Sequence, residues 1–208
     1  VQLGGNPTGP AGATYQWPSA GITQNTLSNP HFNSTGFSPG NYSYEVTVTD
    51  VNGCETSDEV NITVWDDPIA AIDPISNAIC VGDTITISAQ GGMSYLWSPA
   101  GTIINSSSQF TSAFPIITTE YTVTVTDVNG CTATDQEDVI VFPLTQAEAG
   151  NDTNICQQDT LSLGASGGVV YSWASSLFLA STNVADPLAY PVQSNTFTVT
   201  VTDANGCS

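Results

Sequence analysis

One nine-residue motif, Val-Thr-Val-Thr-Asp-x-Asn-Gly-Cys, occurs three times and constrains the fold of this chain more than any other feature. Its copies span positions 46–54, 123–131 and 199–207, so they recur at a nearly constant period. A Tyr-x-Trp motif precedes each copy at an almost constant distance, with its tryptophan at Trp17, Trp97 and Trp173. Motifs that recur together at one period indicate neighbouring copies of one structural unit.

A third motif sets the boundaries of these repeats. Ile-Cys, followed by Asp-Thr and an aliphatic residue, occurs at 79–85 and 155–161, and the spacing from its cysteine to the tryptophan is identical in both copies. The period predicts repeats of about 76 residues each. We expect an N-terminally truncated repeat at 1–65, a complete repeat at 66–142 and a C-terminally truncated repeat at 143–208. A first cysteine upstream of Val1 would account for the odd total of five.

Each repeat is expected to be all-β. Residues 84–89 and 122–126 alternate between apolar and hydroxyl side chains, the period of a half-buried strand, and β-branched residues dominate them. Asp-x-Asn-Gly is a strong hairpin signal because Asn and Gly tolerate a positive φ. About seven short strands per repeat predict an antiparallel, immunoglobulin-like sandwich. In such a sandwich Trp17, Trp97 and Trp173 would anchor the core.

The charge balance excludes several functions. The chain has 19 acidic residues and no Lys or Arg, for a net charge of −19. It therefore lacks the cations that neutralise nucleic-acid phosphates or anionic membrane surfaces, and no apolar run is long enough to span a bilayer. Catalysis is not expected either, because a single histidine, His31, and no cationic side chain leave little for acid–base or oxyanion chemistry.

Regularly spaced cysteines in a chain of extracellular type predict disulfides, and two pairings fit the spacing. Same-repeat bonds would join Cys80 to Cys131 and Cys156 to Cys207. However, the turns that carry these cysteines would lie at opposite ends of a sandwich, about 20 Å apart for strands of six or seven residues, whereas a disulfide needs Cα atoms within about 7 Å. A between-repeat bond from Cys80 to Cys207 avoids this problem. It would leave Cys54, Cys131 and Cys156 to pair with cysteines of further repeats.

A calcium site at the junctions between repeats is a second hypothesis, because Ca²⁺ prefers oxygen ligands. The alternative is that each Asp-x-Asn-Gly aspartate only caps its hairpin turn, and no Glu follows at the position that an EF-hand loop requires. The candidate ligands are the acidic and amide residues of the turns and junctions: Asp66, Asp67, Asp73, Asp127, Asn129, Glu148, Asp152, Asp203 and Asn205.

Residues 149–173 and 197–207, with their Ile-Cys, Tyr-x-Trp and Asp-x-Asn-Gly-Cys motifs, resemble the PKD-like and immunoglobulin-like tandem repeats of giant cell-surface adhesins of gliding Bacteroidota. The Trp-Asp-Phe-Gly-Asp-Gly core typical of PKD domains proper is absent. The resemblance implies a segment of an extracellular stalk or filament, exported by type IX secretion. Its main partners would be the neighbouring repeats of the same chain. Asp83-Thr84-Ile85 and Asp159-Thr160-Leu161 also resemble the O-glycosylation sequon of Bacteroidota, which would modify Thr84 and Thr160.

A different class of function remains open, a module that binds surface glycans or other cell-surface proteins. The stretch between the Trp and the Val-Thr strand varies most among the repeats, and specificity tends to reside in such loops. Its aromatic residues would be the contact points if they are exposed: Phe32, Phe37, Phe110, Phe114, Phe178 and Tyr190.

Overall fold

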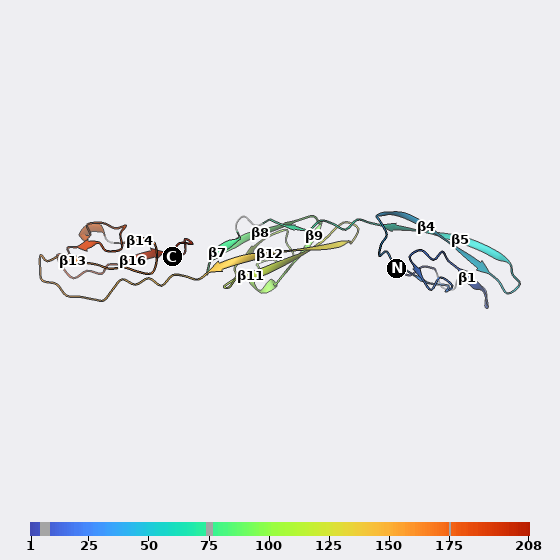
Figure 1. The fold of residues 1–208 in the computed structure, drawn as a ribbon, viewed down its shortest axis with the longest axis horizontal. Coiled ribbons are helices and arrows are strands. Elements are labelled where there is room, and N and C mark those ends of the chain that lie inside the picture. The colour runs from blue at the N-terminus through green and yellow to red at the C-terminus, as the bar shows by residue number, and fades with distance from the viewer. Residues whose placement is uncertain (5–8, 74–76, 175) are drawn as a thin grey trace. The chain divides into compact units, whose positions relative to one another are not determined.

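The computed structural model describes residues 1–4, 9–73, 77–174 and 176–208. Apart from the single-turn 3-10 helices η1 (Ala100–Thr102) and η2 (Ser176–Phe178), the regular structure in these residues consists of β-strands (Figure 1). The prediction of an all-β protein is therefore confirmed. None of the described residues form a helix of the length and apolar character needed to cross a membrane.

The chain divides into two compact units. The first comprises residues 1–68 with 128–132, and the second comprises residues 69–127 with 133–208. The boundary near residue 68 lies close to the predicted end of the first repeat. The division into three repeats at 65 and 142 remains a prediction.

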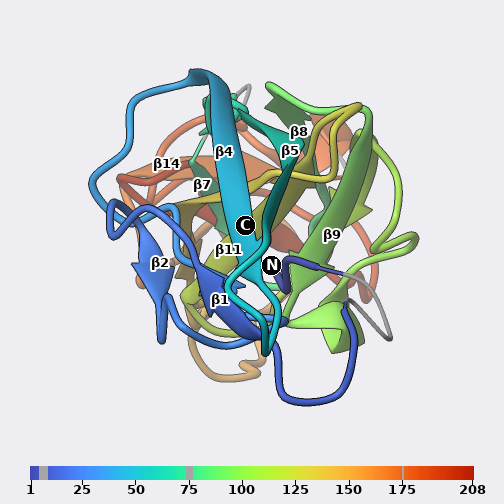
Figure 2. The same cartoon turned by 90° about the vertical axis from the view of Figure 1, so that its right-hand side faces the viewer.

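The first unit is built on a long hairpin. Strands β4 (Gly40–Thr49) and β5 (Glu55–Val64) pair from Gly40 opposite Val64 to Thr49 opposite Glu55, and β1 (Thr14–Gln16) joins the other edge of β4 (Figure 2). A separate pair, β2 (Ile22–Thr23) with β3 (His31–Phe32), contributes Ile22 and Phe32 to the same core. The Asp-x-Asn-Gly motif forms the turn of the long hairpin, as its sequence predicts.

Strands β6 to β12 form the predicted seven-stranded sandwich. Its two sheets have the orders β10-β8-β6 and β7-β12-β11-β9. One pairing departs from the antiparallel expectation, because β7 runs parallel to β12 whereas β6 runs antiparallel to β8. The chain therefore changes sheets between β6 and β7. The strands are β6 (Ala71–Ile72), β7 (Ala78–Cys80), β8 (Ile85–Gln90), β9 (Ser94–Ser98), β10 (Phe110–Ala113), β11 (Thr119–Thr126) and β12 (Thr132–Phe142).

Residues 143–208 contain two small antiparallel sheets. Strand β13 (Leu161–Ser162) pairs with β15 (Leu188–Ala189), and β14 (Val170–Trp173) pairs with β16 (Val199–Thr202). Within the described residues β16 has no second neighbour, whereas β11, which carries the same motif, lies between β9 and β12.

The Tyr-x-Trp motif has one register in all three parts of the chain. Its tyrosine always lies opposite a valine of the Val-Thr strand. The pairs are Tyr15 with Val48, Tyr95 with Val125 and Tyr171 with Val201.

The three tryptophans lie in three separate cores, where the sequence predicts anchors. Trp17, Trp97 and Trp173 are 3%, 1% and 4% exposed. Each indole Nε1 donates to a carbonyl oxygen in the loop that follows, at 2.9–3.0 Å. A buried indole needs such an acceptor, so the loop after each tryptophan is fixed to the core through this bond. The acceptors belong to Leu27, Ser108 and Val184.

Candidate functional site

Two tight turns present cysteines in the same way. Asp50 Oδ1 accepts from the backbone N–H groups of Asn52 and Cys54, both at 2.8 Å. Asp203 Oδ1 accepts from those of Asn205 and Cys207, at 2.8 and 2.9 Å. In both turns the aspartate N–H also donates to the cysteine carbonyl at 2.9 Å. The aspartate thus closes the turn and fixes the cysteine at its end.

These hydrogen bonds favour the ionised form of the carboxylates. The pKa values of Asp50 and Asp203 are lowered, chiefly because each accepts a hydrogen bond from the backbone N–H of the cysteine that ends its turn. A carboxylate held in this way has part of its acceptor capacity occupied, which supports a structural role for the turn.

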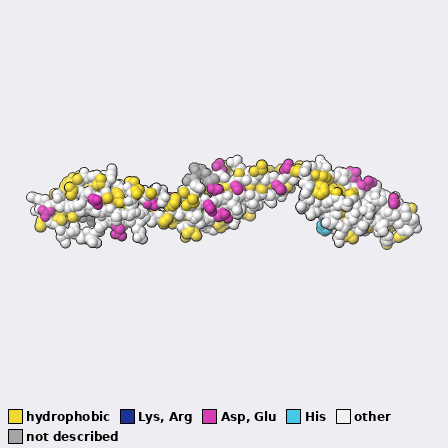
Figure 3. All heavy atoms as spheres, viewed as in Figure 1, with side chains coloured by type: hydrophobic (Ala, Val, Ile, Leu, Met, Phe, Trp, Pro, Cys, Tyr) yellow, Lys and Arg dark blue, Asp and Glu magenta, His cyan; other side chains and the backbone are white. Residues whose placement is uncertain are grey.

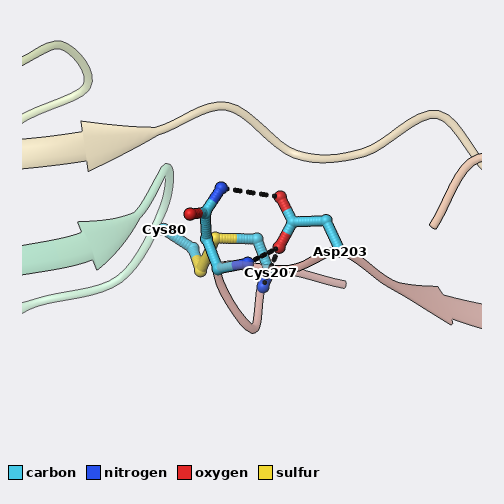
Figure 4. The surroundings of a disulfide bond; sticks show 4 residues. Cys80, Asp203 and Cys207 are labelled. Atoms are coloured by element: carbon cyan, nitrogen blue, oxygen red, sulfur yellow. Dashed lines mark hydrogen bonds between the residues drawn. A yellow bond between two sulfur atoms is a disulfide. The ribbon is translucent and has the colours of Figure 1, made fainter. Parts of the chain in front are cut away.

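A disulfide joins Cys80, at the end of β7, to Cys207, in the last of these turns (Figure 4). The S–S distance is 2.00 Å, the Cα atoms are 5.5 Å apart, and the bond closes a loop of 127 residues. This is the between-repeat pairing that the opposite-ends argument favours. Cys207 is fully buried, so the bond is enclosed on that side.

The alternative same-repeat pairs, Cys80 with Cys131 and Cys156 with Cys207, are not formed. Strand β12 gives the reason. Cys80 lies opposite Phe142, at the end of β12, whereas Cys131 directly precedes Thr132, at its start. An eleven-residue strand at about 3.3 Å per residue separates these points by roughly 33 Å, far beyond the reach of a disulfide.

Two further cysteines carry exposed thiols. Cys54 follows the turn of the first unit, and Cys156 occupies the position that corresponds to Cys80 one period later in the sequence. The local chain is also alike, because Asp83 N donates to Cys80 O at 3.0 Å and Asp159 N donates to Cys156 O at 3.1 Å. Their pairing with cysteines of further repeats remains a prediction.

The structure does not assemble the proposed calcium ligands. Among the described residues, no three His, Cys, Asp or Glu side chains lie close enough together to hold a metal ion. Asn205 donates from its side chain to Asp203 Oδ2 at 3.3 Å, so these two ligands are engaged within their own turn. Calcium binding remains a prediction. The other candidates lie in the β11–β12 turn (Asp127 and Asn129) or on exposed connecting segments (Asp66, Asp67, Asp73, Glu148 and Asp152).

The loop aromatics fall into two groups. Phe32 is buried and Phe37 is half-buried, with their ring centroids 5.2 Å apart in an edge-to-face contact, so they belong to the core of the first unit. In contrast, Phe110, Phe114 and Tyr190 are 63%, 40% and 44% exposed. Phe178, in η2, is half-buried. Of these loop aromatics, the exposed ones are thus confined to the second unit.

The remaining candidates have simple surroundings. His31 is exposed on β3, where its backbone pairs with Thr23. Thr84 and Thr160 are exposed, which is compatible with the expected glycosylation.

The sequence did not predict one feature, a groove of about 630 Å³ between residues 149–157 and 191–197. Trp173 and Phe197 line it.

Comparison with known proteins gives one family match. Residues 1–64 match the family model described as "K319L-like, PKD domain". No curated protein sequence matches the chain.

Solved structures with related arrangements include three whose identity to this chain is low. The amphioxus IgVJ-C2 molecule is 12% identical, with 67% of this chain and 95% of that chain covered and a TM-score of 0.31. The insect immune protein hemolin is 15% identical, with coverages of 93% and 64% and a TM-score of 0.33. Bacteroides ovatus SGBP-B, solved with a mixed-linkage heptasaccharide, is 15% identical, with coverages of 99% and 58% and a TM-score of 0.24. This chain thus spans less than two thirds of the last two proteins. The resemblance to PKD-like domains is confirmed by the family match over residues 1–64.

Proposed function

We propose that these residues form a segment of the stalk of a large secreted cell-surface adhesin, which holds an adhesive region at a distance from the cell. The observation that carries the proposal is the disulfide between Cys80 and Cys207, which links the second predicted repeat to the third. The PKD-type match and this bond together indicate an extracellular protein, because disulfides persist outside reducing compartments.

A between-repeat disulfide suits a chain that carries load. Tension applied at the two ends passes from Cys80 directly to Cys207, so residues 81–206 are bypassed and need not unfold. If Cys156 forms the equivalent bond to the next repeat, its loop overlaps the first loop over residues 156–207. With successive overlapping loops, unfolding without reduction of a disulfide would not lengthen any stretch of the stalk.

The charge of the surface suits a spacer segment whose main partners are the neighbouring repeats. Acidic side chains are dispersed over the visible face in Figure 3, and the chain contains no Lys or Arg. A net charge far from zero keeps such a surface soluble and opposes lateral association. Origin in Bacteroidota, type IX secretion and O-glycosylation at Thr84 and Thr160 belong to this proposal through the family resemblance, as does a non-catalytic role.

A binding module is the second candidate, and the exposed aromatics of the second unit favour it. Phe110 is the first residue of β10, Phe114 directly follows its last residue, and Tyr190 directly follows β15. Exposed aromatic faces are a common means of holding sugars or protein surfaces, since they offer large contact areas at little cost in conformational entropy.

A glycan array probed with the purified 208-residue chain separates the two candidates. A stalk segment is expected to give no saturable binding. Binding that Phe110→Ala or Tyr190→Ala abolishes, but the similarly exposed aliphatic variant Ile117→Ala preserves, would overturn the stalk proposal in favour of the binding module.

A further inference from the structure

The Asn-Gly pair inside each Asp-x-Asn-Gly-Cys turn is prone to a spontaneous reaction. The glycine nitrogen can attack Cγ of the preceding asparagine, because glycine has no Cβ to hinder the approach. A bond forms between this nitrogen and Cγ, the side-chain amide leaves as ammonia, and water then opens the resulting succinimide ring to aspartate or isoaspartate. The pairs Asn52-Gly53, Asn129-Gly130 and Asn205-Gly206 are all exposed, so exclusion of water does not protect them.

The first turn restrains both groups that would have to react. The nucleophile is the nitrogen of Gly53, and its N–H donates to the Asp50 carbonyl oxygen at 3.0 Å. The electrophile is the side chain of Asn52, whose Nδ2 donates to Asp50 Oδ2 at 3.3 Å. The backbone N–H of Asn52 also donates to Asp50 Oδ1 at 2.8 Å, so the asparagine is tied to the aspartate at two points.

The backbone conformation of this turn also opposes ring closure. Val51 and Asn52 both have negative φ, and the bond from Gly53 N to Asp50 O closes the turn, which makes it a type I turn. In such a turn ψ of the third residue is about 0°, so the Gly53 nitrogen eclipses the backbone nitrogen of Asn52. The succinimide ring needs the glycine nitrogen to eclipse Cβ instead. Ring closure therefore requires the turn to open.

The last turn repeats these bonds. The N–H of Gly206 donates to the Asp203 carbonyl oxygen at 3.2 Å, and Asn205 Nδ2 donates to Asp203 Oδ2 at 3.3 Å. The lowered pKa values of Asp50 and Asp203 keep both carboxylates ionised and available as acceptors. Their negative charge also opposes loss of the proton from the nearby glycine N–H, the step that makes its nitrogen nucleophilic.

Isoaspartate in the turn would displace the cysteine that ends it. The chain then runs through the side-chain carbonyl, which lengthens the backbone by one carbon before the glycine. The N–H of Cys207 donates to Asp203 Oδ1 at 2.9 Å, and a longer turn would move it away from this acceptor. Because Cys207 forms the disulfide to Cys80, an intact Asn-Gly pair helps to keep this bond in place.

We propose that Asp50 and Asp203 are positioning residues that protect the Asn-Gly pair of their own turn from succinimide formation. Each fixes the asparagine side chain and holds the turn in a conformation from which the ring does not form. An aspartate accompanies Asn-Gly in all three copies of the motif, at positions 50, 127 and 203. The inference goes beyond the stalk proposal and does not depend on it, because it concerns the chemical lifetime of each turn.

The first test compares the folded chain with the unfolded chain at mildly alkaline pH. Mass spectrometry of chymotryptic peptides follows the conversion of each asparagine, since a chain without Lys or Arg gives no tryptic peptides. Conversion of Asn52 and Asn205 is expected to be at least about tenfold slower in the folded chain than in the chain reduced and unfolded in urea. Equal rates in the two states would overturn the proposal.

The second test removes one aspartate at a time. Asp50→Ala should speed conversion of Asn52 by about tenfold or more, whereas Asn205, whose turn is unchanged, should keep its wild-type rate in the same molecules. The reciprocal variant Asp203→Ala should speed Asn205 and leave Asn52 unchanged. These two variants test the two turns separately, so the test does not depend on one variant alone.

The matched control is Val60→Ala, which removes a contact with the core of the first unit and leaves the turn intact. While circular dichroism shows this variant to be folded, Asn52 should convert at the wild-type rate. A wild-type rate for Asn52 in Asp50→Ala would overturn the proposal, and so would an equal increase in Val60→Ala, which would assign the protection to the fold of the whole unit. Because the glycan array tests only the stalk, the two proposals can fail independently.

Discussion

Removal of the Cys80–Cys207 bond should lengthen the chain under tension by a calculable amount. The bond closes a loop of 127 residues whose ends lie 5.5 Å apart. A fully extended chain spans at most about 3.3–3.6 Å per residue, so the intact bond prevents the extension of roughly 440 Å of contour length. The rest of the chain, outside the loop, accounts for only about 280 Å at the same spacing.

Single-molecule force spectroscopy, with handles at both termini, measures this length directly. The oxidised chain should extend to the shorter contour only, and addition of a reductant or the variant Cys80→Ser should add the hidden length. Cys54→Ser is the matched control, because it removes an exposed thiol outside the loop and should change nothing. If the contour lengths with and without reductant are the same, the load path through the disulfide does not exist.

The same bond sets an upper bound on stability. Loop closure of this length lowers the entropy of the unfolded chain by an amount equivalent to about 5 kcal/mol at 25 °C. Urea unfolding of the oxidised chain and of Cys80→Ser should therefore differ by up to that amount for the transition that opens residues 81–206. An unchanged midpoint for every transition would show that the two halves of the loop unfold without sensing the bond.

Three further changes test individual features. Gly91→Ala should lower the free energy of unfolding by about 1–3 kcal/mol more than Gly82→Ala. Both glycines have φ near +100°, but a Cβ on Gly91 would overlap the Ile69 carbonyl oxygen, whereas a Cβ on Gly82 would face open space. Equal losses of stability in urea unfolding would refute this reasoning. Since the pKa of Asp50 is lowered in the folded state, its charge stabilises the fold above the unfolded pKa of about 3.9 and this contribution is lost as pH falls through the folded pKa. The difference in melting temperature between the wild type and Asp50→Asn should therefore shrink as the pH is lowered from neutral into that range, and a pH-independent difference would exclude the charge effect. Calcium at millimolar concentration, the range of extracellular modules, should raise the melting temperature relative to a chelator; identical curves would remove the calcium hypothesis.

The sequence predicted those parts of the fold that local pattern encodes. Alternation and β-branching at residues 84–89 and 122–126 identified β8 and β11, and Asp-x-Asn-Gly identified the hairpin turns. The Tyr-x-Trp motif lies at the same distance from the Val-Thr strand in the second and third copies, and these two copies have the same register, with Tyr95 opposite Val125 and Tyr171 opposite Val201. The strands and turns depend on near neighbours in the sequence, so one copy of each motif is enough to specify them.

Features that depend on the whole sheet were not predictable in this way. Nothing in residues 71–80 indicates that β6 joins one sheet and β7 the other, because this choice is made by their partners β8 and β12, which lie further along the chain. Likewise Phe32 and Phe110 both lie in the variable stretch between the tryptophan and the Val-Thr strand, on β3 and β10, yet one is buried and the other is 63% exposed. Loop aromatics become core or surface according to which gaps the strands leave, and sequence alone does not contain the sizes of those gaps.

The length of strand β12 accounts for the pairing of the disulfide. Its length keeps Cys131 and Cys80 at opposite ends of one sandwich, so these two cysteines cannot form a bond with each other. Its alternation also supplies Val139 to the core and closes it. A strand that is long enough to cover the core therefore excludes a bond between Cys80 and Cys131 and leaves Cys80 available to Cys207. On this basis the choice of Cys207 rather than Cys131 follows from how strand β12 completes the sandwich of β6 to β12.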